Sequence, residues 1–171
     1  MDIKIKFRHD IKLRPITMED FSCVAKWSKD NVFCIANGWD LNRDEQELFN
    51  WWGRCVNNDS EGFFRIGIEL ESKLIGYADL ACINGNSAEI GIAIGDSTLW
   101  GKGIGSDSCK LLMNYAFKHF GITIFNAETH ETNLRSRKML ESIGFQEASR
   151  IGTEEYLGTD SKLIQYKFIF N

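Results

Sequence analysis

Between residues 63 and 95 the hydrophobic pattern changes from one typical of helices to one typical of β-strands. Three segments are predicted to be strands: 63–70, 74–82 and 88–95. Residues 71–73 form one connection, and the Asn84-Gly85 pair in the other is a strong signal for a tight turn. The sequence therefore predicts a three-stranded antiparallel meander.

Helices and further strands flank this meander. The predicted elements are a strand over 11–14, a helix over 17–29 capped by Thr17, a helix capped by Asn42, a helix over 104–120, a strand over 122–129, a helix over 134–142 ended by Gly144, and strands over 145–150 and 162–170. The order β-α-α-β-β-β-α-β-α-β-β predicts an α+β fold, with one mixed, mostly antiparallel sheet and helices on both faces. Because the chain lacks a linker, a repeat and a low-complexity segment, we expect one domain over residues 1–171.

The composition narrows the possible classes of function. With 43% hydrophobic and 12% aromatic residues the chain can build a core, and its net charge of −4 lacks the basic footprint of a nucleic-acid-binding protein. No apolar run is long enough to cross a membrane, and the charged N-terminus does not resemble a signal peptide. We therefore expect a cytoplasmic protein without nucleic-acid or membrane partners.

The cysteines and histidines do not form a metal-binding pattern. The five cysteines are odd in number and contain no CxxC motif, so buried, reduced thiols are expected. The three histidines, His9, His119 and His130, lie far apart and lack ligand spacing. We expect no metal site.

A glycine-rich loop, Gly101-Lys102-Gly103-Ile104-Gly105, lies between a predicted strand and the long helix. Glycines let a ligand approach the backbone, and the start of a helix offers free N–H groups to an anion such as a pyrophosphate. A Walker loop would need Ser or Thr after Lys102, and a dinucleotide fingerprint would need glycine in place of Ser106. A tight turn that binds no ligand remains the alternative.

The strand that precedes this loop has two different faces. Ile90, Ile92 and Ile94 share one face, whereas Glu89, Gly91 and Ala93 share the other. The isoleucine face belongs in the core. The opposite face, which is nearly bare backbone with one carboxylate, either admits a ligand or is covered by a helix, with Glu89 exposed at the edge.

A further motif covers residues 127–136 and continues through 140–145. It resembles the motif of the fourth helix of GNAT-superfamily N-acetyltransferases, and it is most similar to the branch that acetylates the N-termini of ribosomal proteins. The glycine loop after Trp100 resembles the pyrophosphate loop of the same superfamily, and Leu13-Arg14-Pro15 before an acidic helix start is also similar to that branch. The element order agrees over nearly the whole chain.

This resemblance implies that acetyl-CoA is the cofactor and that an amine is the acceptor. The cofactor-binding residues that it implies are Ile92, Ala93, Ile94, Trp100, Gly101, Lys102, Gly103, Ile104, Gly105, Ser106, Asn133 and Ser136. Many relatives carry a Tyr as general acid where this chain has Leu140, and Ser136 matches the substitute proposed for the similar branch. Asn133 would fix the pantetheine arm or the loop around it, and it could also cap the helix.

Acetyl transfer requires an acceptor that has lost a proton, because the pKa of an alkyl amine is about 10. Glu89 is the candidate general base, and similar enzymes often use a glutamate on this strand.

In the family the acceptor site is lined partly by the connection between the first two helices, which here contains Trp39 and Asp40. Residues 30–61 hold seven acidic and two basic residues, which suits a cationic acceptor but also fits a solvated acidic helix face. Of the adjacent Trp51 and Trp52, only one can face the core.

Three functions are compatible with these sequence features. The first is an acetyl-CoA-dependent N-acetyltransferase that acts on a polyamine, another small cationic amine or a peptide N-terminus by direct attack on the thioester. The second is a non-catalytic CoA-binding sensor or interaction module, favoured by Leu140. The third, an unrelated nucleotide-binding domain, is disfavoured because the Walker and dinucleotide patterns are absent. The protein is expected to be a monomer or a homodimer.

Overall fold

A computed structural model describes residues 7–170. The N-terminal part contains β1 (Ile11–Arg14), a short 3-10 helix (Met18–Asp20), α1 (Phe21–Trp27), α2 (Asn31–Asn37) and α3 (Glu45–Val56). The meander follows as β2 (Phe64–Leu70), β3 (Lys73–Asn84) and β4 (Ser87–Ile94). A second 3-10 turn (Ser97–Leu99) leads to α4 (Ile104–Phe120), β5 (Ile124–His130), α5 (Leu134–Ile143), β6 (Gln146–Ser149), β7 (Thr153–Tyr156) and β8 (Thr159–Ile169).

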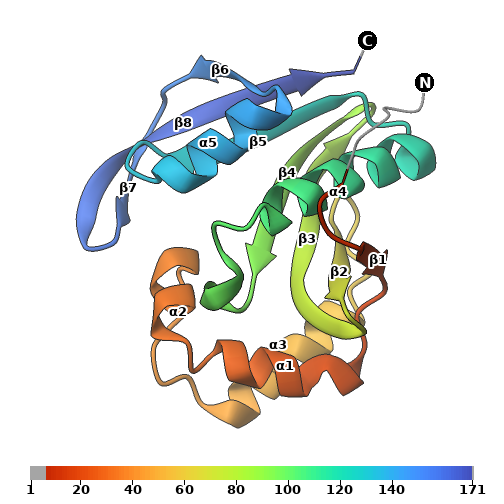
Figure 1. The fold of residues 1–171 in the computed structure, drawn as a ribbon, viewed down its shortest axis with the longest axis vertical. Helices are drawn as coiled ribbons and strands as arrows, with labels where there is room; N and C mark the ends of the chain where they lie inside the picture. Colours follow the sequence, from red (N-terminus) through yellow and green to blue (C-terminus); the bar gives the residue numbers. More distant parts are fainter. Residues whose placement is uncertain (1–6, 171) are drawn as a thin grey trace.

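The strands form one twisted sheet in the order β1-β2-β3-β4-β5-β8-β6, with β7 paired to β8 (Figure 1). The pairing of β4 with β5 is parallel, whereas the other pairings are antiparallel. Asn84 lies opposite Ser87 across the tight turn, as the sequence predicts. The predicted mixed, mostly antiparallel sheet with helices on both faces is confirmed.

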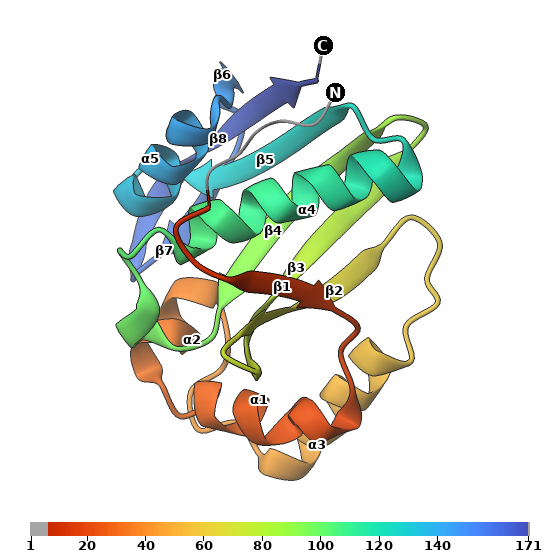
Figure 2. The same cartoon turned by 45° about the vertical axis from the view of Figure 1, so that its right-hand side comes forward.

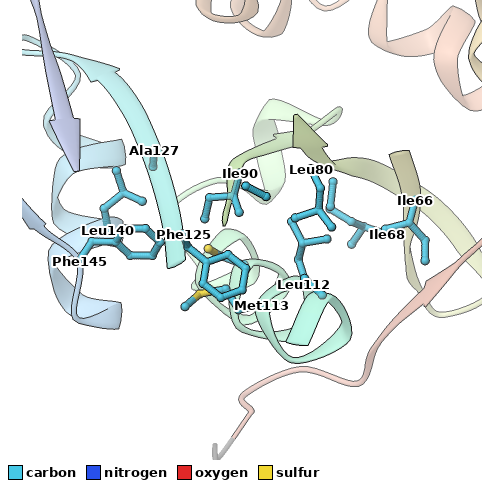
Figure 3. Packing of buried hydrophobic residues seen from close by; sticks show 14 of the residues in the cluster. Ile66, Ile68, Leu80, Ile90, Leu112, Met113, Phe125, Ala127, Leu140 and Phe145 are labelled. Carbon is cyan, nitrogen blue, oxygen red and sulfur yellow. The ribbon is translucent and has the colours of Figure 1, made fainter. Parts of the chain in front are cut away.

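The two faces of the sheet bury different sets of side chains. On the face covered by α4 and α5, which we call the α4 face, Leu112 and Met113 pack against Leu80 and Ile90 (Figure 3). On the other face, which we call the α3 face, Trp27 of α1, Phe33 of α2 and Trp52 of α3 pack against Tyr77 and Ala93. Figure 2 shows α4 lying across the sheet, with α1 and α3 at the far end of the molecule. The β-strands are thus buried between two helical layers.

Several local predictions need correction. A helix, α2, occupies part of the predicted connection between the first two helices, and the strand β7 was not predicted. Asp44, rather than Asn42, caps α3, because its carboxylate accepts a hydrogen bond from the Glu47 N–H at 2.9 Å. Asn42 instead adopts a left-handed conformation with φ 55°. These errors all fall where the chain turns, and hydrophobic periodicity gives little information there.

Other predicted details are confirmed. The bounds of α4 are those predicted, and α5 ends at Gly144, which has φ 113° as a left-handed helix cap requires. Trp52 is fully buried and Trp51 is only partly buried, so one of the pair faces the core.

The cysteines are all free, and Cys34 and Cys109 are buried. Cys82 is exposed, contrary to the expectation, at a register shift between β3 and β4 where its φ is 49°. Within residues 7–170 no cluster of three or more His, Cys, Asp or Glu side chains could hold a metal ion. No helix of this described part is long and apolar enough to cross a membrane.

Candidate active site

The pairing between β4 and β5 is short. It joins Ser87 to Ile124, Ala88 to Phe125 and Glu89 to Asn126, and then it ends. β4 nevertheless continues to Ile94 and β5 to His130, so the two strands diverge (Figure 1). We call the space between residues 90–94 of β4 and 127–130 of β5 the strand gap. It opens the sheet in the middle, where both edges carry backbone N–H and C=O groups.

The direction of the β4 backbone groups follows from the pairing. The Asn86 carbonyl accepts hydrogen bonds from the N–H groups of Thr123 and Ile124, so it faces β5. Because backbone groups alternate sides along a strand, those of Ile92 and Ile94 also point toward β5 and into the strand gap. In agreement, the Ile94 carbonyl turns away from β3 and accepts a 2.9 Å hydrogen bond from the Trp100 indole.

A cavity of about 640 Å³ lies at the strand gap, between β4, the glycine loop and α5. Nine of the predicted cofactor residues line it: Ile92, Ile94, Trp100, Gly101, Gly103, Gly105, Ser106, Asn133 and Ser136. Three do not. Ala93 is buried on the α3 face, Ile104 is buried in the core beneath α4, and Lys102 points to solvent. The side chains of these three residues therefore lie outside the cavity, and a contact through their backbone N–H groups stays a prediction.

The glycine loop and the first turn of α4 border this cavity. Gly101 and Gly103 have φ of 75° and 85°, which favour glycine, and Gly103 is the N-cap of α4. The first N–H groups of a helix have no carbonyl partner within it and carry the positive end of its dipole. This geometry suits an anionic group.

Cationic side chains that were not predicted also line the cavity. They are Arg8 from the segment before β1, Lys110 of α4, and Arg135 and Lys138 of α5. The Arg135 guanidinium lies 3.8 Å from the centroid of the Trp100 ring, so these two residues pack as a pair. Helical spacing could have indicated Lys110, which lies four residues after Ser106 on α4. Arg135 and Lys138 lie one or two residues from Ser136, so helical spacing did not indicate them. Nothing in the sequence pattern indicated Arg8.

The start of α5 confirms that Asn133 is a helix cap. Its side-chain oxygen accepts a hydrogen bond from the Ser136 N–H at 3.2 Å. This cap fixes the first turn, and the Ser136 side chain lines the cavity. Leu140 is 3% exposed and belongs to the hydrophobic core, so its position offers neither a hydroxyl group nor access to the cavity.

Carboxylates lie on the α3 face of the strand gap. Glu89 is exposed, and Glu128, two residues beyond its partner Asn126 on β5, faces it. Although Glu89 is exposed, the surrounding chain removes part of its hydration and so raises its pKa, and the Glu128 charge raises it further. The Gln165 amide donates a 2.8 Å hydrogen bond to Glu128 and thereby fixes that carboxylate. Glu89 is thus a carboxylate that retains its proton to a higher pH than an ordinary glutamate.

The surface above Gly91 is open. An ideal Cβ placed there would meet only the Asp79 Cβ within 4 Å, at 3.8 Å, so no helix within residues 7–170 packs on this stretch of β4. This observation decides between the two sequence interpretations of this strand: the bare backbone near Glu89 and Gly91 is accessible, whereas Ala93 is covered.

An aromatic wall, made of Trp39, Trp51 and Tyr77, borders this open surface. Trp39 and Trp51 meet edge to face with centroids 5.2 Å apart. Arg65 lies 4.1 Å from the Tyr77 centroid and 5.7 Å from that of Trp51, and two 2.7 Å hydrogen bonds join it to Asp79. The negative charge of Asp79 is therefore neutralised by Arg65. Of the predicted acceptor residues, Trp39 belongs to the wall and Asp40 is exposed.

Comparison with known proteins places this geometry in a family. A family model described as an acetyltransferase (GNAT) domain matches residues 10–146. The chain is 27% identical over 150 residues to an uncharacterised protein of Methanocaldococcus jannaschii, matching 86% of this chain and 30% of that protein. The chain therefore spans less than a third of the length of this curated relative.

Solved structures share the fold. A spermidine N-acetyltransferase from Vibrio cholerae, solved with CoA and spermine, aligns with a TM-score of 0.77 at 20% identity over 93% of this chain and 95% of its own. RimL, a ribosomal L7/L12 α-N-protein acetyltransferase solved with coenzyme A, gives a TM-score of 0.77 at 18% identity over 93% of each chain. A domain from M. jannaschii gives 0.70 at 25% identity, over 94% of this chain and 99% of its own. This chain belongs to the GNAT acetyltransferase family, whose enzymes are acetyl-CoA-dependent N-acetyltransferases.

Proposed function

We propose that this chain transfers an acetyl group from acetyl-CoA to a cationic primary amine by direct attack of the amine on the thioester. The observation that carries the proposal is the strand gap, which has a cationic cavity on one side and carboxylates on the α3 face. In this proposal acetyl-CoA occupies the cavity, the amine approaches across the α3 face, and the two react in the gap.

The cavity residues fit acetyl-CoA, which supplies the activated acetyl group. Arg8, Lys110, Arg135 and Lys138 would balance phosphate charges, and the start of α4 offers free N–H groups to the pyrophosphate. An ideal Cβ on Gly105 would lie 3.2 Å from the Met139 sulfur, so a larger side chain there would narrow the space between α4 and α5. The N–H groups of Ile92 and Ile94 would hold the thioester oxygen, since they point into the strand gap.

Glu89 is the residue that we assign to proton removal, directly or through a water. An amine with a pKa of about 10 is mostly protonated at neutral pH and must lose a proton before it attacks. The raised pKa of Glu89 makes it a stronger base than an ordinary carboxylate. At the other end of the reaction, the Ser136 hydroxyl would donate a hydrogen bond to the departing sulfur, a role that Leu140 cannot fill.

The α3 face favours an acceptor that carries more than one positive charge. Glu89 and Glu128 lie close enough to raise the pKa of Glu89, and a cation between them would relieve this repulsion. Trp39 and Trp51 extend the surface with aromatic rings that can bind a second cationic group. We therefore expect a polyamine or another small cationic amine to be a better acceptor than a peptide N-terminus.

The test measures CoA release from acetyl-CoA with spermidine, spermine, an aminoglycoside, a peptide with a free N-terminus and the same peptide N-acetylated as a blank. We expect release that depends on the amine and is fastest with the polycationic acceptors. Tight binding of acetyl-CoA without amine-dependent release across the panel would contradict the proposal. That result would support the alternative of a non-catalytic CoA-binding module.

A further inference from the structure

A buried carboxylate lies where a phosphate-binding site would be expected to avoid one. Asp107 is in the first turn of α4, 2% exposed, and it lines the same cavity as the glycine loop. A negative charge at this point stabilises the helix dipole, but it also repels a bound phosphate. Hydrogen bonds to the carboxylate would offset this repulsion.

Asp107 holds the segment that precedes β1. One carboxylate oxygen accepts hydrogen bonds from the backbone N–H of Arg8 at 2.9 Å and of His9 at 3.2 Å. The same oxygen lies 3.2 Å from His9 Nδ1. These contacts join residues nearly a hundred positions apart in the chain. They occupy the carboxylate, which reduces its repulsion of a nearby anion.

The anchored segment places the Arg8 side chain beside the glycine loop. An ideal Cβ on Gly103 would lie 3.4 Å from Arg8 Nη1, and Arg8 lines the cavity. Figure 2 shows the chain that leads into β1 passing beside the start of α4. The guanidinium therefore lies next to the free N–H groups that would hold a pyrophosphate.

We propose that Arg8 binds the pyrophosphate of CoA and that Asp107 is a positioning residue, which ties the Arg8 backbone to the start of α4. The inference rests on the proposed function, because it assigns a residue to the CoA site. It commits to the pyrophosphate rather than the 3′-phosphate, since Gly103 of the pyrophosphate loop is the residue that Arg8 approaches.

Calorimetric titration with CoA and with 3′-dephospho-CoA tests the role of Arg8. Arg8→Gln should weaken both ligands about tenfold, as loss of one partly screened charge-assisted contact predicts. The matched control is Arg54→Gln, an exposed arginine on α3 outside the cavity lining, which should bind as wild type does. Equal affinity of Arg8→Gln and wild type for CoA would overturn the inference. So would a loss seen only with CoA, which would assign Arg8 to the 3′-phosphate.

Asp107→Ala tests the positioning role. If the carboxylate only repels phosphate, its removal should tighten CoA binding, and this result would overturn the proposal. If it positions Arg8, affinity should fall about as much as in Arg8→Gln, and the double variant should lose no more than either single variant. Additive losses would mean that Asp107 acts on the fold instead.

Thermal unfolding without ligand shows whether the Asp107→Ala protein is folded. If it is not, the Arg8→Gln variant still tests the inference, because Arg8 is exposed and its replacement should leave the fold intact. Failure of the proposed function would look different from failure of this inference, because the wild-type protein itself would then not bind CoA.

Discussion

The two faces of the strand gap differ in how their residues come together. On the α4 face, the cavity is built mainly from two continuous stretches, the glycine loop with the start of α4 and the start of α5. On the α3 face, the surface combines Glu89 of β4, Glu128 of β5, Asp79 of β3, Arg65 of β2 and the tryptophans of the helical segment. The residues of the α4 face are therefore brought together largely by local sequence, whereas those of the α3 face depend on how separate strands and helices pair and pack.

The largest effect is expected from Glu89→Gln, which removes the carboxylate of the α3 face without changing the cavity. The rate at neutral pH should fall about a hundredfold or more if Glu89 is the general base, while acetyl-CoA affinity stays near normal. Higher pH should restore part of the rate, since more of the amine is then already neutral. A pH–rate profile at saturating acetyl-CoA measures this.

The alternative for Glu89 is that it binds a cationic acceptor without taking its proton. In that case Glu89→Gln should raise the Michaelis constant for the amine and leave the saturated rate intact. A profile that matches wild type in height and shape would remove Glu89 from both roles.

A smaller effect is expected on the other face from Ser136→Ala. The rate should fall on the order of 10- to 100-fold if the hydroxyl assists the departing sulfur. The Asn133 cap should persist, because it uses the Ser136 backbone N–H, so the unfolding temperature should change little. Ser142→Ala, a second cavity-lining serine on α5, is the matched control. A rate within about twofold of wild type would make Ser136 structural.

The smallest effect is expected from Glu128→Gln, and it concerns pH. If Glu89 is the general base, it works only when deprotonated, so activity should fall as the pH drops through its raised pKa. Removing the Glu128 charge lowers the Glu89 pKa, so the acid limb of the rate profile should move to lower pH. The shift should be partial, because desolvation is the larger cause of the raised Glu89 pKa and persists in the variant. An unchanged acid limb would show that Glu128 does not influence the base.

The α4 face and the α3 face also differ in how much of each the sequence could predict. The ends of α4 and α5 were predictable because glycines and a capping Asn mark them, and most of the cavity follows from these ends. Arg8 could not be predicted, since its place depends on hydrogen bonds to Asp107, nearly a hundred residues away.

The α3 face was less accessible to prediction. Glu128 becomes part of the site only through the register of β4 with β5, which no local pattern determines. The acidic segment 30–61 suggested an anionic acceptor site, but it could not show that Arg65 of β2 stacks on Trp51 there and pairs with Asp79 of β3.

A pair of glycine variants tests most directly whether donor and acceptor reach the strand gap from opposite faces of the sheet. Gly91→Val adds a side chain to the open α3 face in a strand that suits Val, and Gly105→Val adds one between α4 and α5. Calorimetry gives the acetyl-CoA affinity and steady-state kinetics gives the amine dependence of both variants. We predict that Gly91→Val raises the Michaelis constant for the amine about tenfold or more with acetyl-CoA affinity within about twofold of wild type, and that Gly105→Val does the reverse. A loss of acetyl-CoA affinity in folded Gly91→Val, or unchanged amine kinetics in it, would contradict the account.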